Sequence, residues 1–174
     1  MTLTMNDAAV HTLGLLAGLG GAAPQGGLAP GLRARLATGI SRRGEVLVWA
    51  DSAADAAGAP SFFPDLTAWE CGDSSFHLED HVPVDVATVD GEPRIAEDGQ
   101  RLLLLHGVAL ALEFGRLVHG LARPCPVRCV TGANETNATF RFHRIRPGES
   151  WHHPDLDGYQ DSKLVVADFA PAPA

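Results

Sequence analysis

The sequence predicts an α+β domain in which an antiparallel or mixed sheet packs against one central apolar helix. Apolar residues nearly encircle a helix over residues 101–122, which is typical of a helix buried on most sides. Two alternating segments, residues 127–131 and 139–145, are joined by a polar turn and indicate an antiparallel hairpin. Because the strands come in hairpins and do not alternate with helices, α+β is favoured over a doubly wound parallel sheet.

The chain length sets the expected number of domains. A chain of 174 residues with 45% hydrophobic residues can bury the core of one domain. We therefore expect a single domain over residues 1–170. Residues 171–174, Pro-Ala-Pro-Ala, are expected to form a disordered tail.

The first predicted elements are two helices. Asn6 or Asp7 can cap a first helix that runs to about Leu19, where two glycines stop it. Pro30 suits the first turn of a second, short helix. The apolar residues assigned to this second helix are Leu32, Leu36 and Ile40.

Strands and loops follow these helices. Residues 45–50 contain four consecutive apolar residues and indicate a strand, whereas residues 51–64 read as a loop. Residues 84–96 indicate a hairpin around the turn signal Asp90-Gly91, and its second strand carries a proline that belongs at a sheet edge. Residues 163–169 are predicted to be the last strand of the sheet.

The central helix carries a narrow polar stripe. Its members are His106, Glu113, Arg116 and Arg123. The pattern predicts that Glu113 is the carboxylate that is partly buried, with Arg116 as its partner on the next turn. A structural ion pair is favoured over a catalytic acid at this position.

The charge of the chain is strongly negative and unevenly distributed. The formal net charge is −8, and residues 65–98 form an acidic block with ten acids against one base, Arg94. Because phosphate neutralisation needs a surplus of Lys and Arg on one face, this charge argues against a general nucleic-acid binder. The first 23 residues lack the Lys or Arg of a signal peptide, and polar residues interrupt residues 102–122. We therefore expect a cytoplasmic protein with no membrane partner.

A local basic cluster stands out against this acidity. It consists of Arg141, His143, Arg144 and Arg146. The cluster suits an anion or the carboxylates of a partner, and it equally suits neutralisation of the acidic block within the fold. The intramolecular use is favoured.

Two histidine clusters are candidate metal sites. His77 and His81 would share one face of a helix, with Glu79 or Asp80 as a further ligand, but the flanking Ser and Pro residues argue against a helix there. His152 and His153 are adjacent in sequence, and such side chains usually point apart. Because neither cluster has four ligands at a recognisable spacing, we expect no bound metal and no cofactor.

Nucleophilic catalysis has no clear candidate in the sequence. Cys71, Cys125 and Cys129 match neither a disulfide framework nor a zinc knuckle, so we expect reduced, mostly buried thiols. The acidic neighbours of Cys71 would raise the pKa of its thiol. No G-x-S-x-G motif is present, and we predict no catalytic residue.

The small size, the acidity and the lack of a catalytic set together resemble the small acidic immunity proteins that neutralise bacterial toxins. Residues 137–151, NATFRFHRIRPGESW, followed by PDLDGY at residues 154–159, are similar to a signature of such proteins. The resemblance implies a protein-binding module that docks onto a cationic toxin domain through an acidic surface.

The acidic block is the expected docking surface. Its acids would steer association, and the aromatic residues in or beside the block would anchor the partner if exposed. These are Phe62, Phe63, Trp69 and Phe76. The expected partner-binding residues are Trp69, Asp73, Phe76, Glu79, Asp80 and Asp85. The alternative function is a small metal-dependent enzyme that uses the His77/His81 or the His152/His153 cluster. A protruding acidic surface would favour binding, whereas His and acid side chains that converge on a cavity would favour catalysis.

Overall fold

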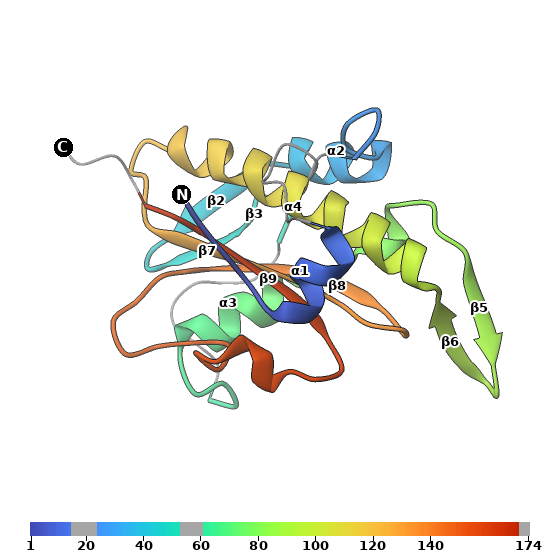
Figure 1. Cartoon of the computed structure of the whole chain (residues 1–174). Helices are drawn as coiled ribbons and strands as arrows, with labels where there is room; N and C mark the ends of the chain where they lie inside the picture. The colour runs from blue at the N-terminus through green and yellow to red at the C-terminus, as the bar shows by residue number, and fades with distance from the viewer. Residues whose placement is uncertain (15–23, 53–60, 171–174) are drawn as a thin grey trace.

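The computed structural model describes residues 1–14, 24–52 and 61–170. Its centre is a five-stranded sheet in which all neighbouring strands are antiparallel (Figure 1). In spatial order the strands are β1 (Thr2–Met5), β9 (Lys163–Phe169), β7 (Val127–Ala133), β8 (Ala138–Arg144) and β4 (Phe76–His77). The predicted α+β fold is confirmed.

Helix α4 (Glu97–His119) crosses one face of this sheet (Figure 1). It is long and apolar enough to cross a membrane, but 61% of its most apolar window is buried within the protein. The predicted packing is confirmed, since Phe142 of β8 is fully buried and only Leu112 on the outer side of the helix is 38% exposed. Gly107 and Gly115 allow α4 to approach the sheet closely. A Cβ at Gly107 would lie 2.3 Å from Cγ2 of Thr131 in β7, and one at Gly115 would lie 2.4 Å from Cε1 of Phe169 in β9.

An aromatic cluster fills the core between α4 and the sheet. The Trp49 ring is fully buried and packs edge-to-face on Phe114, with 5.6 Å between ring centroids, and on Phe142 at 5.2 Å. The indole N–H of Trp49 donates to the carbonyl of Ser74 at 3.1 Å, so the one polar atom of the ring is satisfied. This cluster joins the central helix, the sheet and the strand that carries Trp49 into one core.

The N-terminal helices are shorter than predicted. Helix α1 (Asp7–Leu13) begins at the predicted cap, where the Asn6 side chain accepts from the backbone N–H of Ala9. It ends at Gly14, which has a left-handed φ of 68°, and not near Leu19, which lies outside the described residues. The predicted helix at Pro30 is confirmed as α2 (Pro30–Ala37).

A two-stranded sheet follows α2. Its strands are β2 (Ile40–Arg43) and β3 (Val46–Trp49), and β3 confirms the strand predicted over residues 45–50. The assignment of Ile40 to the preceding helix is wrong. Gly39 adopts a φ of 75° and ends the helix, so Ile40 enters a strand opposite Trp49.

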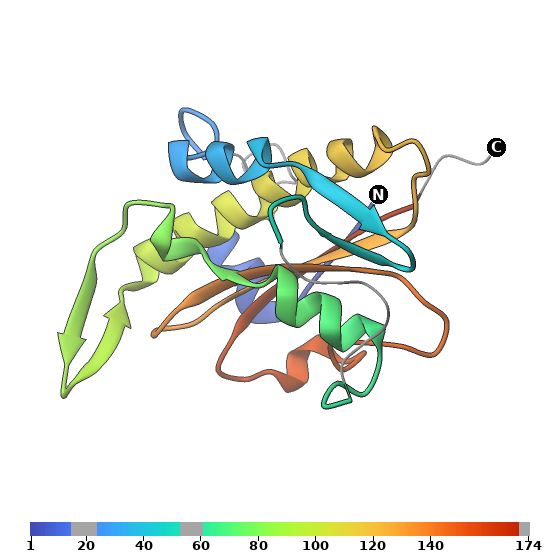
Figure 2. The same ribbon diagram turned by 180° about the vertical axis from the view of Figure 1, so that it is seen from behind.

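The acidic block contains a helix and a hairpin. Helix α3 (Leu66–Ser74) has no counterpart among the predicted elements and runs beside β8. The hairpin of β5 (Val86–Val89) and β6 (Glu92–Ile95) confirms the predicted hairpin, with positive φ at both Asp90 and Gly91 of its turn. This hairpin projects beyond the end of the sheet (Figures 1 and 2).

The C-terminal half follows the sequence prediction closely. Strands β7, β8 and β9 lie where alternation placed them, and the loop after β8 covers the sheet face opposite α4 with a 3₁₀ turn at Leu156–Gly158. The edge strands β1 and β4 were not predicted, because each is too short to show alternation. The predicted tail, residues 171–174, and most of the loop predicted over residues 51–64 lie outside the described residues.

Candidate functional site

Part of the acidic block seals the edge of strand β8. The backbone N–H of Ala138 donates to Oε2 of Glu79 at 3.0 Å, and that of Arg144 donates to Oε2 of Glu70 at 2.8 Å. Between them, the Ser74 hydroxyl accepts from the N–H of Phe142 and donates to its carbonyl. Side chains therefore satisfy a strand edge that would otherwise invite pairing with another chain.

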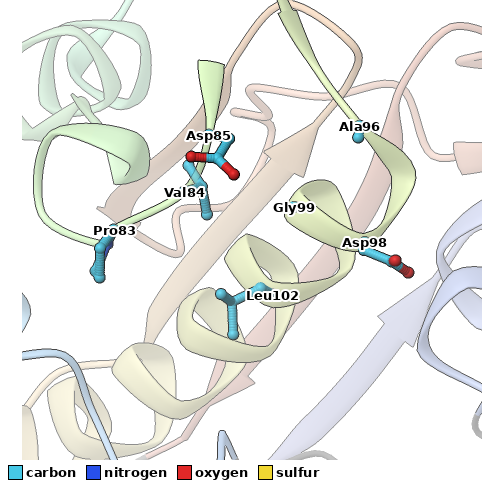
Figure 3. A pocket seen from close by; sticks show the side chains of 7 residues that line it. All are labelled: Pro83, Val84, Asp85, Ala96, Asp98, Gly99 and Leu102. Atoms are coloured by element: carbon cyan, nitrogen blue, oxygen red, sulfur yellow. The ribbon is translucent and has the colours of Figure 1, made fainter. Parts of the chain in front are cut away.

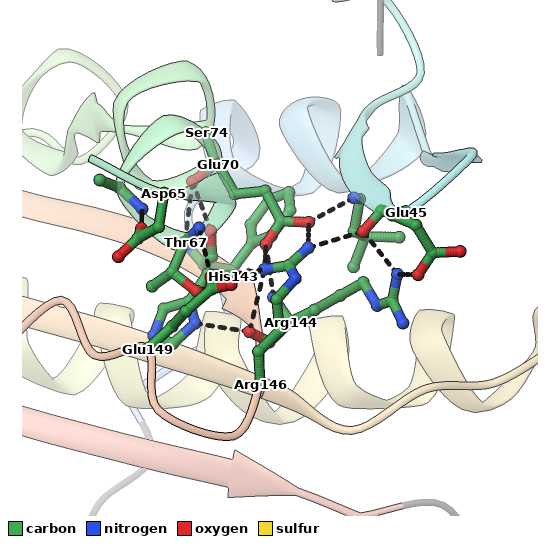
Figure 4. Close-up of polar contacts among 12 residues, drawn as sticks. Glu45, Asp65, Thr67, Glu70, Ser74, His143, Arg144, Arg146 and Glu149 are labelled. Carbon is green, nitrogen blue, oxygen red and sulfur yellow. Dashed lines mark hydrogen bonds and ion pairs between the residues drawn. The ribbon is translucent and has the colours of Figure 1, made fainter. Parts of the chain in front are cut away.

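Glu70 is the centre of a buried polar network (Figure 4). Its side chain is fully buried and accepts two bonds from the Arg146 guanidinium, at 2.7 and 2.8 Å, beside the bond from Arg144. The N–H of Leu47 in β3 adds a fourth bond at 2.7 Å. One carboxylate thus joins α3, β3, β8 and the chain after β8, and four donors offset the cost of its burial.

The prediction for Glu113 is confirmed in part. Its partner is Arg116, and the residue is partly buried, with 45% of its side chain exposed. It is not the only such carboxylate, because the fold buries Glu70 fully. In the rest of the polar stripe Arg116 is exposed, whereas His106 is buried and Arg123 lies beyond the end of α4.

The intramolecular use of the basic cluster, neutralisation of the acidic block, is confirmed for Arg146, whereas Arg144 pairs with an acid outside that block. Arg144 pairs with Glu45 at 2.9 Å, and Arg146 pairs with Glu70 of the acidic block. His143 is buried, and burial lowers the pKa of its imidazole to about 4. Arg141 differs from these three and lines a cavity on the sheet face opposite α4.

The four aromatic residues expected to anchor a partner differ in exposure. Phe62 is 79% exposed, and Phe63 beside it is half-buried. Trp69 is 6% exposed and lies in a small core with Val46 and Val48, so it does not meet the condition of exposure. Phe76 is half-buried and packs against Phe140, with 5.6 Å between ring centroids.

Of the four acids expected in the docking surface, two are bonded within the fold and two are exposed. Glu79 is held by Ala138 and by His77, and Asp73 accepts a bond from the Ser52 hydroxyl at 2.9 Å. Both contribute to the fold and are only partly accessible. Asp80 and Asp85 are exposed, and Asp85 stands at the base of the protruding hairpin.

The base of the β5–β6 hairpin is bonded to the rest of the protein, although its strands do not pair with the central sheet. Ile95 at its base is 2% exposed, and its backbone N–H donates to the Glu135 carbonyl. The Gln100 side chain donates to the Ile95 carbonyl at 2.8 Å. Gly99 of α4 leaves the necessary room, because a Cβ there would lie 2.9 Å from Cγ2 of Ile95.

A cleft of about 450 Å³ opens where the hairpin meets α4 (Figure 3). Pro83, Val84 and Leu102 give it an apolar wall, and the acids in its lining are Asp85 and Asp98. The two carboxylates come from different elements, the segment leading into β5 and the first turn of α4, and that of Asp98 points away from Asp85. This arrangement fits the aliphatic stem of a Lys or Arg side chain, with its charged head beside Asp85.

The charge around this cleft is largely uncompensated. Within residues 1–14, 24–52 and 61–170, Asp85, Asp90, Glu92 and Asp98 make no ion pair. Of the bases nearby, Arg94 pairs with Glu135 and Lys163 pairs with Glu97 at 3.0 Å. Arg101, one turn after Asp98 on α4, is exposed and makes no ion pair in the described part of the chain. We call this surface, Asp85–Glu92 with Asp98, the acidic hairpin.

Two valines expose apolar surface on the same hairpin. Val86 is 46% exposed and Val89 is 48% exposed, both on strand β5. Within the described residues strand β5 pairs with β6 and with no other strand, so its other edge is open there. The acidic hairpin therefore offers charge, apolar contacts and unpaired backbone groups together.

Comparison with known proteins gives one match. Residues 23–171 match the Uncharacterized protein PM0498 family. The chain belongs to this family. No curated protein and no solved structure matches the sequence. The matched region of the PM0498 family includes α2, the acidic hairpin, the central helix and the last three strands, whereas β1 and α1 precede it.

The two histidine clusters of this PM0498 family member do not form metal centres in the described part of the chain, where no three His, Cys, Asp or Glu side chains gather. His77 contacts Glu79, while the His81 ring packs on Phe76. His152 accepts a bond from Arg128. The structure therefore offers no observation in favour of the metal-dependent enzyme.

The three cysteines are buried and reduced, as predicted. The pKa of the Cys71 thiol rises to about 12, first because of burial and to a smaller degree because of Glu70 and Asp65. Burial likewise raises the pKa of the Cys125 and Cys129 thiols. Such thiols are poor nucleophiles at neutral pH.

Proposed function

We propose that this protein is a protein-binding module that holds a cationic protein partner on the acidic hairpin, and that it acts as an immunity protein that neutralises a bacterial toxin domain. The observation that carries the proposal is the cleft between α4 and the segment leading into β5, which has an apolar wall, Asp85 in its lining and Asp98 at its edge. Such a cleft suits a basic side chain from a partner better than a small neutral substrate.

The distribution of charge supports the same function. The chain carries a net charge of −8, and the acids that the fold does not use concentrate on an element that protrudes (Figure 2). Exposed charges of one sign steer a partner of opposite sign and raise the association rate. A toxin that acts on nucleic acids or nucleotides has a cationic cleft, and an inhibitor with a protruding acidic hairpin would enter it.

The apolar groups of the hairpin add the contacts that charge alone does not supply. Rim charges change association rates more than affinity, whereas desolvated apolar contacts at the centre of an interface hold the complex together. Val86 and Val89 take this second role in the proposal, with the open edge of β5 beside them.

The test is association with the product of the adjacent gene, because an immunity gene is normally carried beside its toxin. The double variant Asp85→Asn/Asp98→Asn should slow association by about tenfold at low salt and flatten its salt dependence. The matched control is Glu113→Gln/Asp161→Asn, which removes the same charge outside the acidic hairpin, at one half-exposed and one exposed position. Association rates should be measured by stopped flow or surface plasmon resonance across a range of salt.

Two results would contradict the proposal. Equal rates for the wild type and the Asp85/Asp98 variant across all salt concentrations would remove the acidic hairpin from the mechanism. Failure of the adjacent gene product to bind at all would exclude it as the partner and would favour the alternative, an enzymatic function.

A further inference from the structure

Arg141 is the member of the basic cluster whose charge the fold leaves without an acid. Its Nη2 donates to the Thr139 hydroxyl at 3.1 Å, and its guanidinium carbon lies 5.1 Å from the centroid of the Trp151 ring. Among residues 1–14, 24–52 and 61–170 it pairs with no carboxylate. A guanidinium has five N–H groups, so most of its donor capacity remains available.

The surroundings of Arg141 form a cavity of about 340 Å³. Its floor is the sheet face opposite α4, where Val130 of β7 pairs with Arg141 and Gly132 pairs with Thr139. Trp151 and Tyr159 from the loop after β8 line the other side. This volume is at the lower end of the range for small-molecule sites.

Burial of the Arg141 charge without an acidic partner is unfavourable for the folded protein. Burial lowers the pKa of the Arg141 guanidinium below its usual value, and no nearby carboxylate opposes that effect. A partly desolvated charge without a partner destabilises a protein unless a ligand supplies the opposite charge. The other cation near the cavity, Arg128, is already paired with Asp168 through two bonds of 2.7 Å.

Polar groups around the cavity complete a site for one negative charge. The hydroxyl of Tyr159 accepts a bond from the backbone N–H of His153, so its own proton remains free to be donated. His152 accepts a bond from Arg128 through Nε2, and His77 contacts Glu79 at 2.9 Å. Among the described residues that line the cavity, Arg141 is thus the one Lys or Arg side chain, and it has no acidic partner.

We propose that this cavity binds a carboxylate, which pairs with the free N–H groups of Arg141 and lies beside the Trp151 ring. Arg recognises a carboxylate through two parallel bonds, and one uncompensated cation matches a monoanion better than it matches phosphate at neutral pH. The carboxylate belongs either to a small organic acid or to the C-terminus of a peptide, because both fit the same chemistry. The site lies apart from the acidic hairpin, so it does not depend on the proposed function.

The experiment is a titration followed by two-dimensional ¹H–¹⁵N NMR, with benzoate, benzamide and inorganic phosphate as probes. A tripeptide with a free C-terminal carboxylate and the same tripeptide amidated form the second arm. We expect benzoate or the peptide acid to shift the Arg141 side-chain signal and the amides of β7 and β8 saturably. Benzamide, phosphate and the amidated peptide should not do so.

The variant Arg141→Gln should weaken this binding by about tenfold or more, because it removes the charge-assisted bonds. The matched control, Arg116→Gln on the exposed side of α4, should bind like the wild type. If Arg141 served only to support Trp151, its loss would lower the melting temperature, whereas we expect Arg141→Gln to be at least as stable as the wild type.

Each outcome decides the proposal. Saturable binding of benzoate that is lost with Arg141 supports a small-acid site, and binding of the peptide acid alone supports the peptide terminus. No saturable binding of either carboxylate, binding of phosphate in preference to carboxylates, or binding unchanged in Arg141→Gln would overturn it.

Discussion

Two carboxylates of the acidic block, Glu70 and Asp85, lie 15 positions apart in sequence and have opposite surroundings. Glu70 is fully buried and accepts four hydrogen bonds, whereas Asp85 is exposed and makes no ion pair in the described part of the chain. The first closes the edges of two strands and the second stands beside an open cleft. Residue type and local charge density therefore do not reveal which acids a fold uses for itself.

The largest effect is expected from loss of the buried carboxylate. Glu70→Gln should lower the free energy of unfolding by about 3–5 kcal/mol, because it leaves the Arg146 charge buried without compensation. Chemical denaturation followed by circular dichroism measures this difference. Glu113→Gln is the matched control, since its ion pair is exposed and should cost no more than about 1 kcal/mol. Equal losses in the two variants would show that burial does not distinguish the two pairs.

A smaller change in the free energy of unfolding is expected when the pH is lowered, because of the buried His143 in the same region. The pKa of His143 falls from 6.5 to about 4 on folding, so between these values the unfolded chain binds a proton that the folded chain does not. Stability should therefore decrease as pH falls through this window, by up to roughly 3 kcal/mol from this group. Unfolding curves of the wild type and His143→Gln between pH 7 and pH 4.5 measure it, and the variant should lose less stability. Parallel pH profiles would mean that His143 is already protonated in the folded protein.

The smallest effect on stability is expected at the acidic hairpin. Asp85→Asn/Asp98→Asn should change the free energy of unfolding by no more than about 0.5 kcal/mol, because neither carboxylate has a bonded partner in the fold. The same denaturation experiment measures it. A loss comparable to that of Glu70→Gln would assign these acids to the fold and remove the contrast between the two regions.

Elements with a clear period could be predicted from the sequence. The helix over residues 97–119 and the strands β7, β8 and β9 have apolar patterns that match their burial, and the Asp90-Gly91 turn marks the hairpin. Strands β1 and β4 have no such signal, because they are four and two residues long. They exist only because longer strands offer them an edge.

The candidate site could be predicted only in part. The acidic block up to Asp98 and its hairpin could be found, but the place of Asp98 beside the cleft depends on how the hairpin meets α4. The signal for this contact is Gly99, a glycine inside a helix, which indicates close approach of another segment. The burial of Trp69 could not be predicted, because helix α3 carries few apolar residues on a regular face.

The position of β9 also governs how the chain can assemble during synthesis. The strand lies between β1 and β7, and Thr2 pairs with Asp168. A nascent chain therefore emerges with its first strand unpaired and keeps it so until the last strand leaves the ribosome. Until then β7 also lacks a neighbour on that side, and α4 lacks the Phe169 side chain that packs against it at Gly115. The protein thus has a long interval of exposure before its sheet closes, and a chain terminated before β9 would remain in that aggregation-prone state.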